Sequence, residues 1–367
     1  GFSGKALIES SQTQLPSQAQ LSSQTQLPPS PQPSQPSHPG CHLCPRDCSA
    51  PRTVARPGFC GADDGLIDPQ GGYIQFRVAR VMVHEWEEPF ISGSRGSGAV
   101  FFSGCSLGCS FCQNGPISHG HQGLLMDGDA LIDVVLDLQS AGVHNLNLVT
   151  PSHVADRLPE WLRRLGCQPA WQDQPLPVIW NSSGYETVDS LLPLQGLVQI
   201  YLPDLKFHDA GLSRDLAGAA DYFTVAAKAI LEMHRQQPEP VWSPDGLLRS
   251  GLVVRHLVLP GHWRDSCRLI DFMADTLPLS TPLSLMSQYT PQVPHPGLPS
   301  SQRDGAPSSQ PLDDHPEMNR RLTTYEYRKV VDYAQDRGFG HILTQERSSA
   351  SSDYTPDFSE RFRPGRT

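Results

Sequence analysis

The sequence lacks three features that would each assign the protein to a broad class. None of its apolar runs reaches the roughly 18 residues that a membrane-spanning helix needs, so we expect no membrane partner. Basic residues are too few for general nucleic-acid binding, because 28 Lys and Arg stand against 38 Asp and Glu, a net charge of −10. No charged segment followed by an apolar one marks a secretory signal. We expect a cytoplasmic protein, with an organelle as the alternative because Gly1 opens the chain in place of a Met.

The cysteines are grouped in a way that is unusual for a disulfide-bonded protein. Secreted disulfide scaffolds are short and have even cysteine counts, whereas this chain has 9 cysteines in 367 residues. Cys167 and Cys267 stand alone and are predicted to be small buried side chains. The others form two short clusters, which are Cys41, Cys44, Cys48 and Cys60, and then Cys105, Cys109 and Cys112. Such spacings favour metal ligation in a reducing compartment.

Proline, serine and glutamine are concentrated in segments that flank the apolar part of the chain. Residues 1–40 have few apolar side chains to offset the entropy of ordering, so we expect a disordered low-complexity segment. A cysteine-rich metal-binding segment is expected over 41–75. A core domain is expected over 76–345, with a flexible insertion at 291–316 and a polar tail over 346–367.

Between these segments, short apolar runs alternate with helical patterns. The predicted strands are Ala99–Ser103, Asn145–Val149, Pro177–Asn181, Val198–Asp204, Leu252–Leu257 and Leu283–Gln288. The predicted helices are Asp129–Ala141, Val154–Leu165, Val188–Leu194, Asp221–Arg235, Arg264–Thr276 and Tyr325–Arg337. Such β–α units in series predict an α/β fold with a parallel sheet, either doubly wound or curled into a partial barrel. Both architectures place the reactive site at the carboxyl ends of the strands.

The second cysteine cluster follows the first predicted strand directly. Cys105, Cys109 and Cys112 are therefore expected where chemistry occurs in such folds. A [4Fe–4S] cluster normally takes four cysteines, so three would leave one iron open to another ligand. Structural zinc, the first alternative, usually has four ligands with two-residue spacing in both pairs. Free buried thiols, the second alternative, would be an improbable coincidence at this density.

The Cx3Cx2C spacing, with Phe111 before the last cysteine, resembles the signature of the radical S-adenosylmethionine (SAM) superfamily. Within it, the chain is similar to homologues of the pyruvate formate-lyase activating enzyme, in particular the PflX-like branch. The segments that carry this resemblance are CHLCPRDC (41–48), GCSLGCSFCQN (104–114), NLVTPSH (147–153), YLPDLKF (201–207), VVRHLVLPGH (253–262) and LSLMSQYTP (283–291). The resemblance implies a partial (β/α)6 barrel of the radical SAM type, preceded by the small cysteine-rich segment.

The resemblance also implies a cofactor and a set of contacts. Cys105, Cys109 and Cys112 would hold the [4Fe–4S] cluster, and the open iron would be chelated by SAM. Phe111 would lie against the adenine. The place of the family's Gly-Gly-Glu-Pro turn, which holds the SAM amino group, is taken here by residues 149–153, where the Thr150 or Ser152 hydroxyl or a backbone carbonyl could substitute.

Five further residues lie at or after the later strands. Asn181 and Ser183 lie in a turn similar to the ribose-contacting turn of activating enzymes. Asp204 and Lys206 match a strand end close to SAM, and an ammonium there needs a partner, which we predict to be Asp204. Arg255 could pair with the SAM carboxylate. From the residues alone, a polar side chain at a strand end is as typical of a helix cap or turn as of a binding site.

The activity implied is that of a radical SAM oxidoreductase. SAM would be cleaved reductively to a 5′-deoxyadenosyl radical, with electrons from a donor such as flavodoxin or ferredoxin. We expect the radical to act on a glycyl-radical enzyme, which would be the partner of this protein. The alternative is that the substrate is a small molecule or a peptide. A hypothesis of another class is a non-catalytic iron–sulfur or zinc protein that transfers electrons or mediates interactions.

The first cysteine cluster is compact enough to hold a metal of its own. Cys41, Cys44, Cys48 and Cys60 satisfy either tetrahedral zinc or a second [4Fe–4S] cluster, and the spacing does not separate these alternatives.

Two other polar segments are predicted to be surface. His84 and the acidic residues Glu85, Glu87 and Glu88 are more typical of a solvated face than of the alternative, an acidic loop near the site. The His-Gly-His run at 119–121 is expected in an exposed loop.

Overall fold

The described residues form one unit of the chain. The computed structural model describes residues 40–63, 74–291 and 314–345. By its contacts the chain separates into Gly1–His38 and Pro39–Thr367, and every described residue belongs to the second unit. The disorder expected over 1–40, the insertion over 291–316 and the tail over 346–367 therefore fall outside the described residues, apart from a few positions at their edges.

The fold is mixed α/β, as the sequence predicts. The strands are β1 Gln75–His84, β2 Ser97–Phe102, β3 Leu124–Asp127, β4 Leu146–Val149, β5 Val178–Ser182, β6 Ile200–Pro203, β7 Val241–Trp242, β8 Leu248–Leu252, β9 Val254–Leu257, β10 Leu283–Met286 and β11 Ile342–Thr344. The α-helices are α1 Pro89–Ser92, α2 Gly115–Ser118, α3 Gly128–Ser140, α4 Leu158–Gly166, α5 Pro169–Asp173, α6 Val188–Leu191, α7 Ala210–Ala217, α8 Tyr222–Gln236, α9 Trp263–Thr276 and α10 Thr324–Asp336. Short 3-10 helices are η1 Ser152–Val154, η2 Leu192–Leu194 and η3 Pro316–Asn319.

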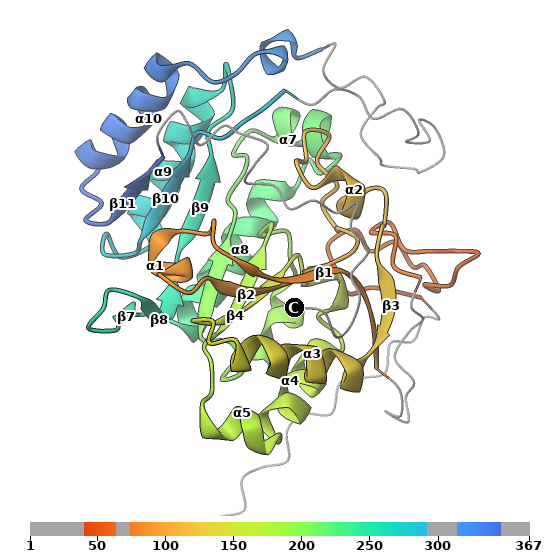
Figure 1. The fold of residues 1–367 in the computed structure, drawn as a ribbon. Coiled ribbons are helices and arrows are strands. Elements are labelled where there is room, and N and C mark those ends of the chain that lie inside the picture. The colour runs from red at the N-terminus through yellow and green to blue at the C-terminus, as the bar shows by residue number, and fades with distance from the viewer. Residues whose placement is uncertain (1–39, 64–73, 292–313, 346–367) are drawn as a thin grey trace, which may run out of the picture. The chain divides into compact units, whose positions relative to one another are not determined.

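The strands form an 8-stranded sheet, in the order β3-β1-β2-β4-β5-β6-β8-β7, and a 3-stranded sheet, in the order β11-β10-β9 (Figure 1). Strands β2, β4, β5 and β6 pair in parallel, and so do β9, β10 and β11. The two sheets meet just after β6, where Leu205 N donates to Arg255 O (2.8 Å) and Asp204 forms a parallel bridge with Arg255. The six predicted strands thus run parallel in chain order, which is the arrangement of a partial (β/α)6 barrel.

Three predicted elements differ from those observed by more than their end residues. The predicted helix Val188–Leu194 is divided between α6 and η2. The predicted strand Leu252–Leu257 is divided between β8, which pairs with β6, and β9, which pairs with β10. The predicted helix Val154–Leu165 begins four residues late, as α4, with η1 before it. Pro159 accounts for the shift, because proline is tolerated in the first turn of a helix but breaks its interior. The antiparallel strands β1 and β3 extend the sheet beyond the predicted series.

The helices cover the sheet with the apolar faces that the sequence predicts. On α3, Leu131, Val134, Val135 and Leu138 are all buried in the main core. Trp161 of α4 is fully buried against the same core, and its indole N–H donates to Gly128 O (2.9 Å). A buried aromatic side chain of this size contributes about 3 kcal/mol or more to stability. Among the helices described, none combines the length and apolar character that crossing a membrane requires.

The register brings the carboxyl ends of four parallel strands to one level. Phe101 pairs with Val149, Val149 with Asn181, and Ser182 with Pro203. The loops that follow β2, β4, β5 and β6 therefore meet on one rim of the sheet. Every residue that the resemblance assigns to SAM lies in or beside these loops, except Arg255 on β9.

Candidate functional site

The three-cysteine loop leaves the sheet directly after β2. Gly104 adopts φ +107°, and a Cβ there would meet Cys60 O at 2.4 Å, so the turn requires glycine. Leu107 N lies 3.4 Å from Cys105 Sγ, and the Ser118 hydroxyl lies 3.3 Å from Cys112 Sγ. Donors aimed at sulfur stabilise a thiolate more than a thiol.

Burial keeps two of these thiols from ionising on their own. Cys109 is 7% exposed, and burial raises the pKa of its thiol well above the ordinary value, although Lys206 opposes the shift. Burial and the neighbouring Cys105 raise the pKa of Cys112 as well. No disulfide joins any of the nine cysteines. Such thiols are inert unless a metal holds them as thiolates, which is the state that metal binding imposes.

A connected set of charges, here called the rim network, lies beside this loop. The Lys206 ammonium donates to Asp204 Oδ2 (2.6 Å), so the predicted partner of Lys206 is confirmed. Arg255 Nε donates to Asp204 Oδ1 (2.8 Å), and Arg255 Nη2 donates to Asn181 Oδ1 (2.6 Å). Arg255 Nη1 lies 3.3 Å from Glu87 Oε2. All three guanidinium nitrogens of Arg255 therefore have partners within the protein.

Glu87 lies inside the rim network, so the solvated face predicted for this segment is wrong for His84, Glu87 and Glu88, although Glu85 is exposed. Glu87 Oε1 accepts hydrogen bonds from Asn147 Nδ2 (3.0 Å) and Asn181 Nδ2 (3.2 Å), and the side chain is 10% exposed. Glu88 is half-buried; Ser284 hydrogen-bonds to its carboxylate, and Arg255 acts on that carboxylate electrostatically. Helix α1, which begins right after these residues, buries Phe90 and Ile91 against the sheet and so brings both acids inward.

Burial and charge pairing divide the carboxylates of the rim network into two groups. Burial raises the pKa of Glu87 and of Glu88 above the usual range, and Arg255 only partly offsets it. For Asp204 burial acts in the same direction, but Arg255 and Lys206 outweigh it and hold the pKa below the usual range. Asp204 is thus the carboxylate that stays ionised across the neutral range.

The other predicted SAM contacts lie on the same rim. Phe111 is 5% exposed, with its ring centroid 6.0 Å from that of Phe207 and 6.2 Å from that of Tyr289. Ser183 is partly exposed, and its carbonyl accepts a hydrogen bond from the Tyr222 hydroxyl (2.8 Å). These positions bring the predicted adenine and ribose contacts to the side of the sheet that carries the cysteines.

A buried acid that the sequence analysis missed fixes two of the rim turns. Glu186 accepts hydrogen bonds from the Ser152 hydroxyl (2.7 Å), the Ser182 hydroxyl (2.8 Å) and the Trp180 indole (2.6 Å). Burial raises the pKa of Glu186 above its usual range, and these donors oppose the rise. Because Ser152 follows β4 and Ser182 ends β5, Glu186 ties the turn at 150–153 to the turn at 182–184.

The backbone at Thr150 is strained. Its φ is +58°, in the left-handed region that a β-branched residue rarely adopts, and its N–H donates to Asn181 O (2.8 Å). We expect Thr150→Gly to raise the free energy of unfolding by about 1 kcal/mol, because the left-handed conformation costs a non-glycine residue about 1–2 kcal/mol and glycine's greater entropy in the unfolded chain offsets part of the gain. Urea denaturation of the variant and of the parent measures this difference in the free energy of unfolding. A Thr150→Gly variant that is less stable than the parent would show that the Thr150 hydroxyl stabilises the fold by more than the backbone strain destabilises it.

The first cysteine cluster packs against the three-cysteine loop. Its Arg46 donates to Ser106 O (2.9 Å) and Leu107 O (2.7 Å) in that loop, and to Ala217 O (2.6 Å) and Gly218 O at the end of α7. Nothing in the local sequence signals that Arg46 makes these contacts. They couple the position of one cysteine cluster to that of the other.

The four thiols of this first cluster differ in charge state. A hydrogen bond with Cys41 lowers the pKa of Cys48 to about 5, and the same bond raises that of Cys41. Burial raises the pKa of Cys60 to about 12, and that of Cys44 is raised for the same reason. Cys48 is thus ionised at neutral pH, which is the form that binds a metal.

Three predictions about isolated residues are corrected. Cys167 is exposed and Cys267 is half-buried, so neither is the buried apolar side chain that we predicted. His121 is only partly exposed, because its ring packs over Gly61, where a Cβ would come within 1.9 Å of the ring.

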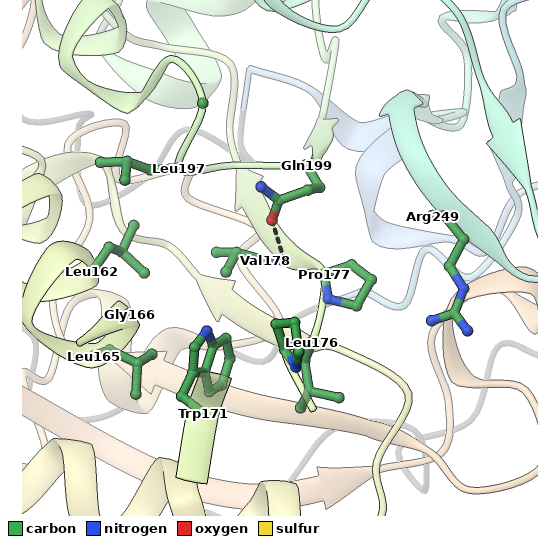
Figure 2. Close-up of a pocket in the computed structure, with 12 residues that line it drawn as sticks. Leu162, Leu165, Gly166, Trp171, Leu176, Pro177, Val178, Leu197, Gln199 and Arg249 are labelled. Atoms are coloured by element: carbon green, nitrogen blue, oxygen red, sulfur yellow. Dashed lines mark hydrogen bonds between the residues drawn. The ribbon is translucent and has the colours of Figure 1, made fainter. Parts of the chain in front are cut away.

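A separate cavity of about 560 Å³ lies away from this rim. Figure 2 shows its apolar walls, with Leu162, Leu165 and Trp171 on one side, and Gln199 Oε1 accepting a hydrogen bond from Val178 N (2.9 Å). Val178 and Gln199 lie at the amino ends of β5 and β6. The cavity is therefore at the opposite end of the strands from the cysteines and does not form part of the candidate site.

Comparison with known proteins gives remote likenesses only. No protein-family model matches the chain. An uncharacterized protein of Methanocaldococcus jannaschii is 25% identical over 303 residues, which are 80% of this chain and 74% of that protein. Among solved structures, Streptococcus suis SuiB bound to the precursor peptide SuiA matches with 11% identity over 66% of this chain and 46% of that one (TM-score 0.43). Methylornithine synthase (PylB) matches with 16% identity over 71% of this chain and 75% of that one (TM-score 0.37). The chain spans less than half of SuiB, and at TM-scores below 0.5 these likenesses identify neither a common fold nor a common function.

Proposed function

We propose that the protein is a radical SAM enzyme whose [4Fe–4S] cluster is held by Cys105, Cys109 and Cys112. One observation carries the proposal: a loop with three thiols at this spacing lies at the carboxyl ends of parallel strands, next to the rim network. Lys206 acts electrostatically on Cys109 and Cys112. A cation so placed offsets the negative charge of a thiolate-bound cluster.

The residues present fit such a group. The loop offers three thiols. Cys109 is buried and Cys112 is half-buried, and both stay protonated without a metal, while donors already point at Cys105 Sγ and Cys112 Sγ. Three ligands leave one iron free, as SAM chelation requires. When bound, the cluster would supply the electron that cleaves SAM to methionine and a 5′-deoxyadenosyl radical.

The chain's own residues would then orient SAM and exclude water. Asp204, held ionised by Lys206 and Arg255, offers a fixed carboxylate on the rim for a cationic or hydroxyl group. The turns at 150–153 and 182–184 are fixed relative to each other by Glu186, so contacts made by Thr150 and Ser183 would be held at a constant separation. Phe111, Phe207 and Tyr289 form a buried aromatic cluster beside the cysteines, and Phe111 is the member of it that we expect to meet the adenine.

The test is anaerobic reconstitution with iron and sulfide, followed by dithionite and SAM. We expect 5′-deoxyadenosine and methionine in equal amounts, measured by liquid chromatography. A protein that shows a normal cluster absorption spectrum and yet yields no 5′-deoxyadenosine would refute the proposal. Cys167→Ser, which changes an exposed thiol, serves as the matched control and should retain full product formation.

The motif resemblance supports a finer proposal, in which the protein belongs to the PflX-like branch and activates a glycyl-radical enzyme with electrons from flavodoxin or ferredoxin. A stable organic radical on a partner enzyme, seen by electron paramagnetic resonance, would support it. A modified small molecule or peptide in place of that radical would contradict it. The thiols of Cys41, Cys44, Cys48 and Cys60 are proposed to hold a second cluster or zinc, and iron, sulfide and zinc contents distinguish the two.

A further inference from the structure

One group of potential metal ligands lies apart from all the cysteines. The group consists of His262, His315 and Glu317, whose ligand atoms all lie within 4.8 Å of one another. Within residues 40–63, 74–291 and 314–345, no other three His, Cys, Asp or Glu side chains bring their ligand atoms this close together. His262 precedes α9, and the other two residues lie at the start of η3, so the set joins segments more than 50 positions apart.

The separations suit ligands of a single ion. His262 Nε2 lies 2.8 Å from Glu317 Oε1, and His315 Nδ1 lies 3.1 Å from the same oxygen. Two ligands at bonds of about 2.0–2.1 Å and angles of 90–109° stand roughly 2.8–3.4 Å apart. The side chains are 22%, 15% and 26% exposed for His262, His315 and Glu317, so an ion could reach them while most of its surroundings are protein.

The other ring nitrogen of His315 gives a second, independent indication. Nε2 is buried without a hydrogen-bond partner, and the nearest acid is Asp215 Oδ2 at 3.4 Å. If a neutral His315 donates from Nδ1 to Glu317, Nε2 carries a lone pair that faces a carboxylate, which is unfavourable. If Nδ1 binds a metal, Nε2 carries the proton, and a small rotation of the ring would direct it to Asp215 Oδ2, 3.4 Å away. Metal-bound histidines usually donate their second N–H to a carboxylate in this way.

The backbone of the neighbouring loop is shaped to admit Glu317. Gly261 has φ +82°, and a Cβ there would lie 2.6 Å from Glu317 Cγ. Glycine is therefore needed both for the left-handed turn and for the approach of the glutamate to His262.

We propose that His262 Nε2, His315 Nδ1 and Glu317 Oε1 bind one divalent transition-metal ion of the zinc, cobalt or iron class, with Asp215 orienting His315. Two imidazoles and one carboxylate favour these ions over calcium and magnesium, which prefer oxygen ligands. The site does not depend on the proposed function, because it shares no residue with the cysteine clusters.

The ion would fix the wall of the candidate site. Asp215 lies on α7, whose Leu216 carbonyl accepts a hydrogen bond from Ser110 N (2.8 Å) in the three-cysteine loop. On the other side, Met318 of η3 accepts from the Tyr289 hydroxyl (2.7 Å), and Tyr289 packs near Phe111. The metal would thus hold η3 and α9 against the elements that carry the cysteine loop.

The experiment measures cobalt and zinc binding by the full chain after its cysteines have been loaded with iron and sulfide. We expect one added equivalent of Co²⁺ per chain, with weak visible d–d bands and without the intense near-ultraviolet absorption of cobalt–thiolate bonds. Glu317→Gln, which keeps the shape of the side chain, should lose this equivalent, and Asp215→Asn should bind about 10–100-fold more weakly. His234→Ala, a partly exposed histidine on α8, is the control and should bind as the parent does.

Thermal unfolding adds a readout that does not depend on spectra. Zn²⁺ should raise the Tm of the parent and of His234→Ala, and leave that of Glu317→Gln unchanged. Equal cobalt binding by Glu317→Gln and the parent would overturn the proposal.

Discussion

Replacing Cys109 with alanine is expected to reduce 5′-deoxyadenosine formation to the background without enzyme and to remove about four irons per chain. Two thiolates cannot hold a cluster that already has one iron without a protein ligand. The change itself is small, because cysteine and alanine differ by one sulfur, so the fold should persist. Far-ultraviolet circular dichroism and the Tm check that it does. Iron content and product formation are measured on the same preparation.

Two further variants separate this prediction from general loss of metal. Cys44→Ala should lose the metal of the first cysteine cluster while the three-cysteine loop keeps its own ligands. Cys167→Ala should change neither quantity, because the Cys167 side chain is exposed and far in sequence from either cluster. Full product formation by Cys109→Ala would exclude the three-cysteine loop as the catalytic centre.

Replacing Arg255 with methionine is expected to lower the free energy of unfolding by about 3–5 kcal/mol, since removing one partner leaves buried charges without compensation. Arg255 contacts Asp204, Glu87 and Asn181, and its side chain is 13% exposed. Chemical denaturation at pH 7 measures the loss. Arg163→Met is the matched control, because Arg163 is 55% exposed in a 3.5 Å pair with Glu160. Such a surface pair contributes about 0.5 kcal/mol or less.

The destabilisation of Arg255→Met should grow with pH. Burial already raises the pKa of Glu87 and Glu88 above the ordinary value of 4.5, and loss of the cation raises it further. At any pH between the pKa of these carboxyl groups in the unfolded chain and their higher pKa in the folded protein, the native state binds more protons than the unfolded state. The free energy of unfolding therefore falls as the pH rises through this interval. Glu87→Gln in the same variant should recover part of the loss at pH 7. If Arg255→Met lowers the free energy of unfolding by the same amount at pH 5 and at pH 8, the carboxylates of Glu87 and Glu88 are not the cause of its destabilisation.

The pairing of Lys206 with Asp204 shows what local pattern can predict. An ammonium next to a buried strand needs a counter-ion, and only two positions separate the residues, so short-range geometry decides their contact. The placement of Cys105, Cys109 and Cys112 after β2 followed in the same way, from an apolar run that ends at a glycine. Both predictions use information that lies within about ten residues of the chain.

Glu87 shows what such patterns miss. It stands among other acids and beside an exposed tryptophan, a composition typical of solvent-facing segments, yet it accepts hydrogen bonds from Asn147 and Asn181. Arg46, Glu186 and the set His262, His315 and Glu317 were missed for the same reason. Their partners lie between 2 and more than 170 positions away, and all of the sites depend on how loops close over the sheet.

The sequence by itself determined the parallel strands, the α/β class and the loop that presents three thiols, because hydrophobic period and cysteine spacing are local properties. Only the tertiary structure decided which charges are buried together at the rim. The register of β4, β5 and β6, and the bridge between Asp204 and Arg255, bring those side chains to one place. Burial then makes each buried charge dependent on a partner, because a charge out of water is costly unless it is paired.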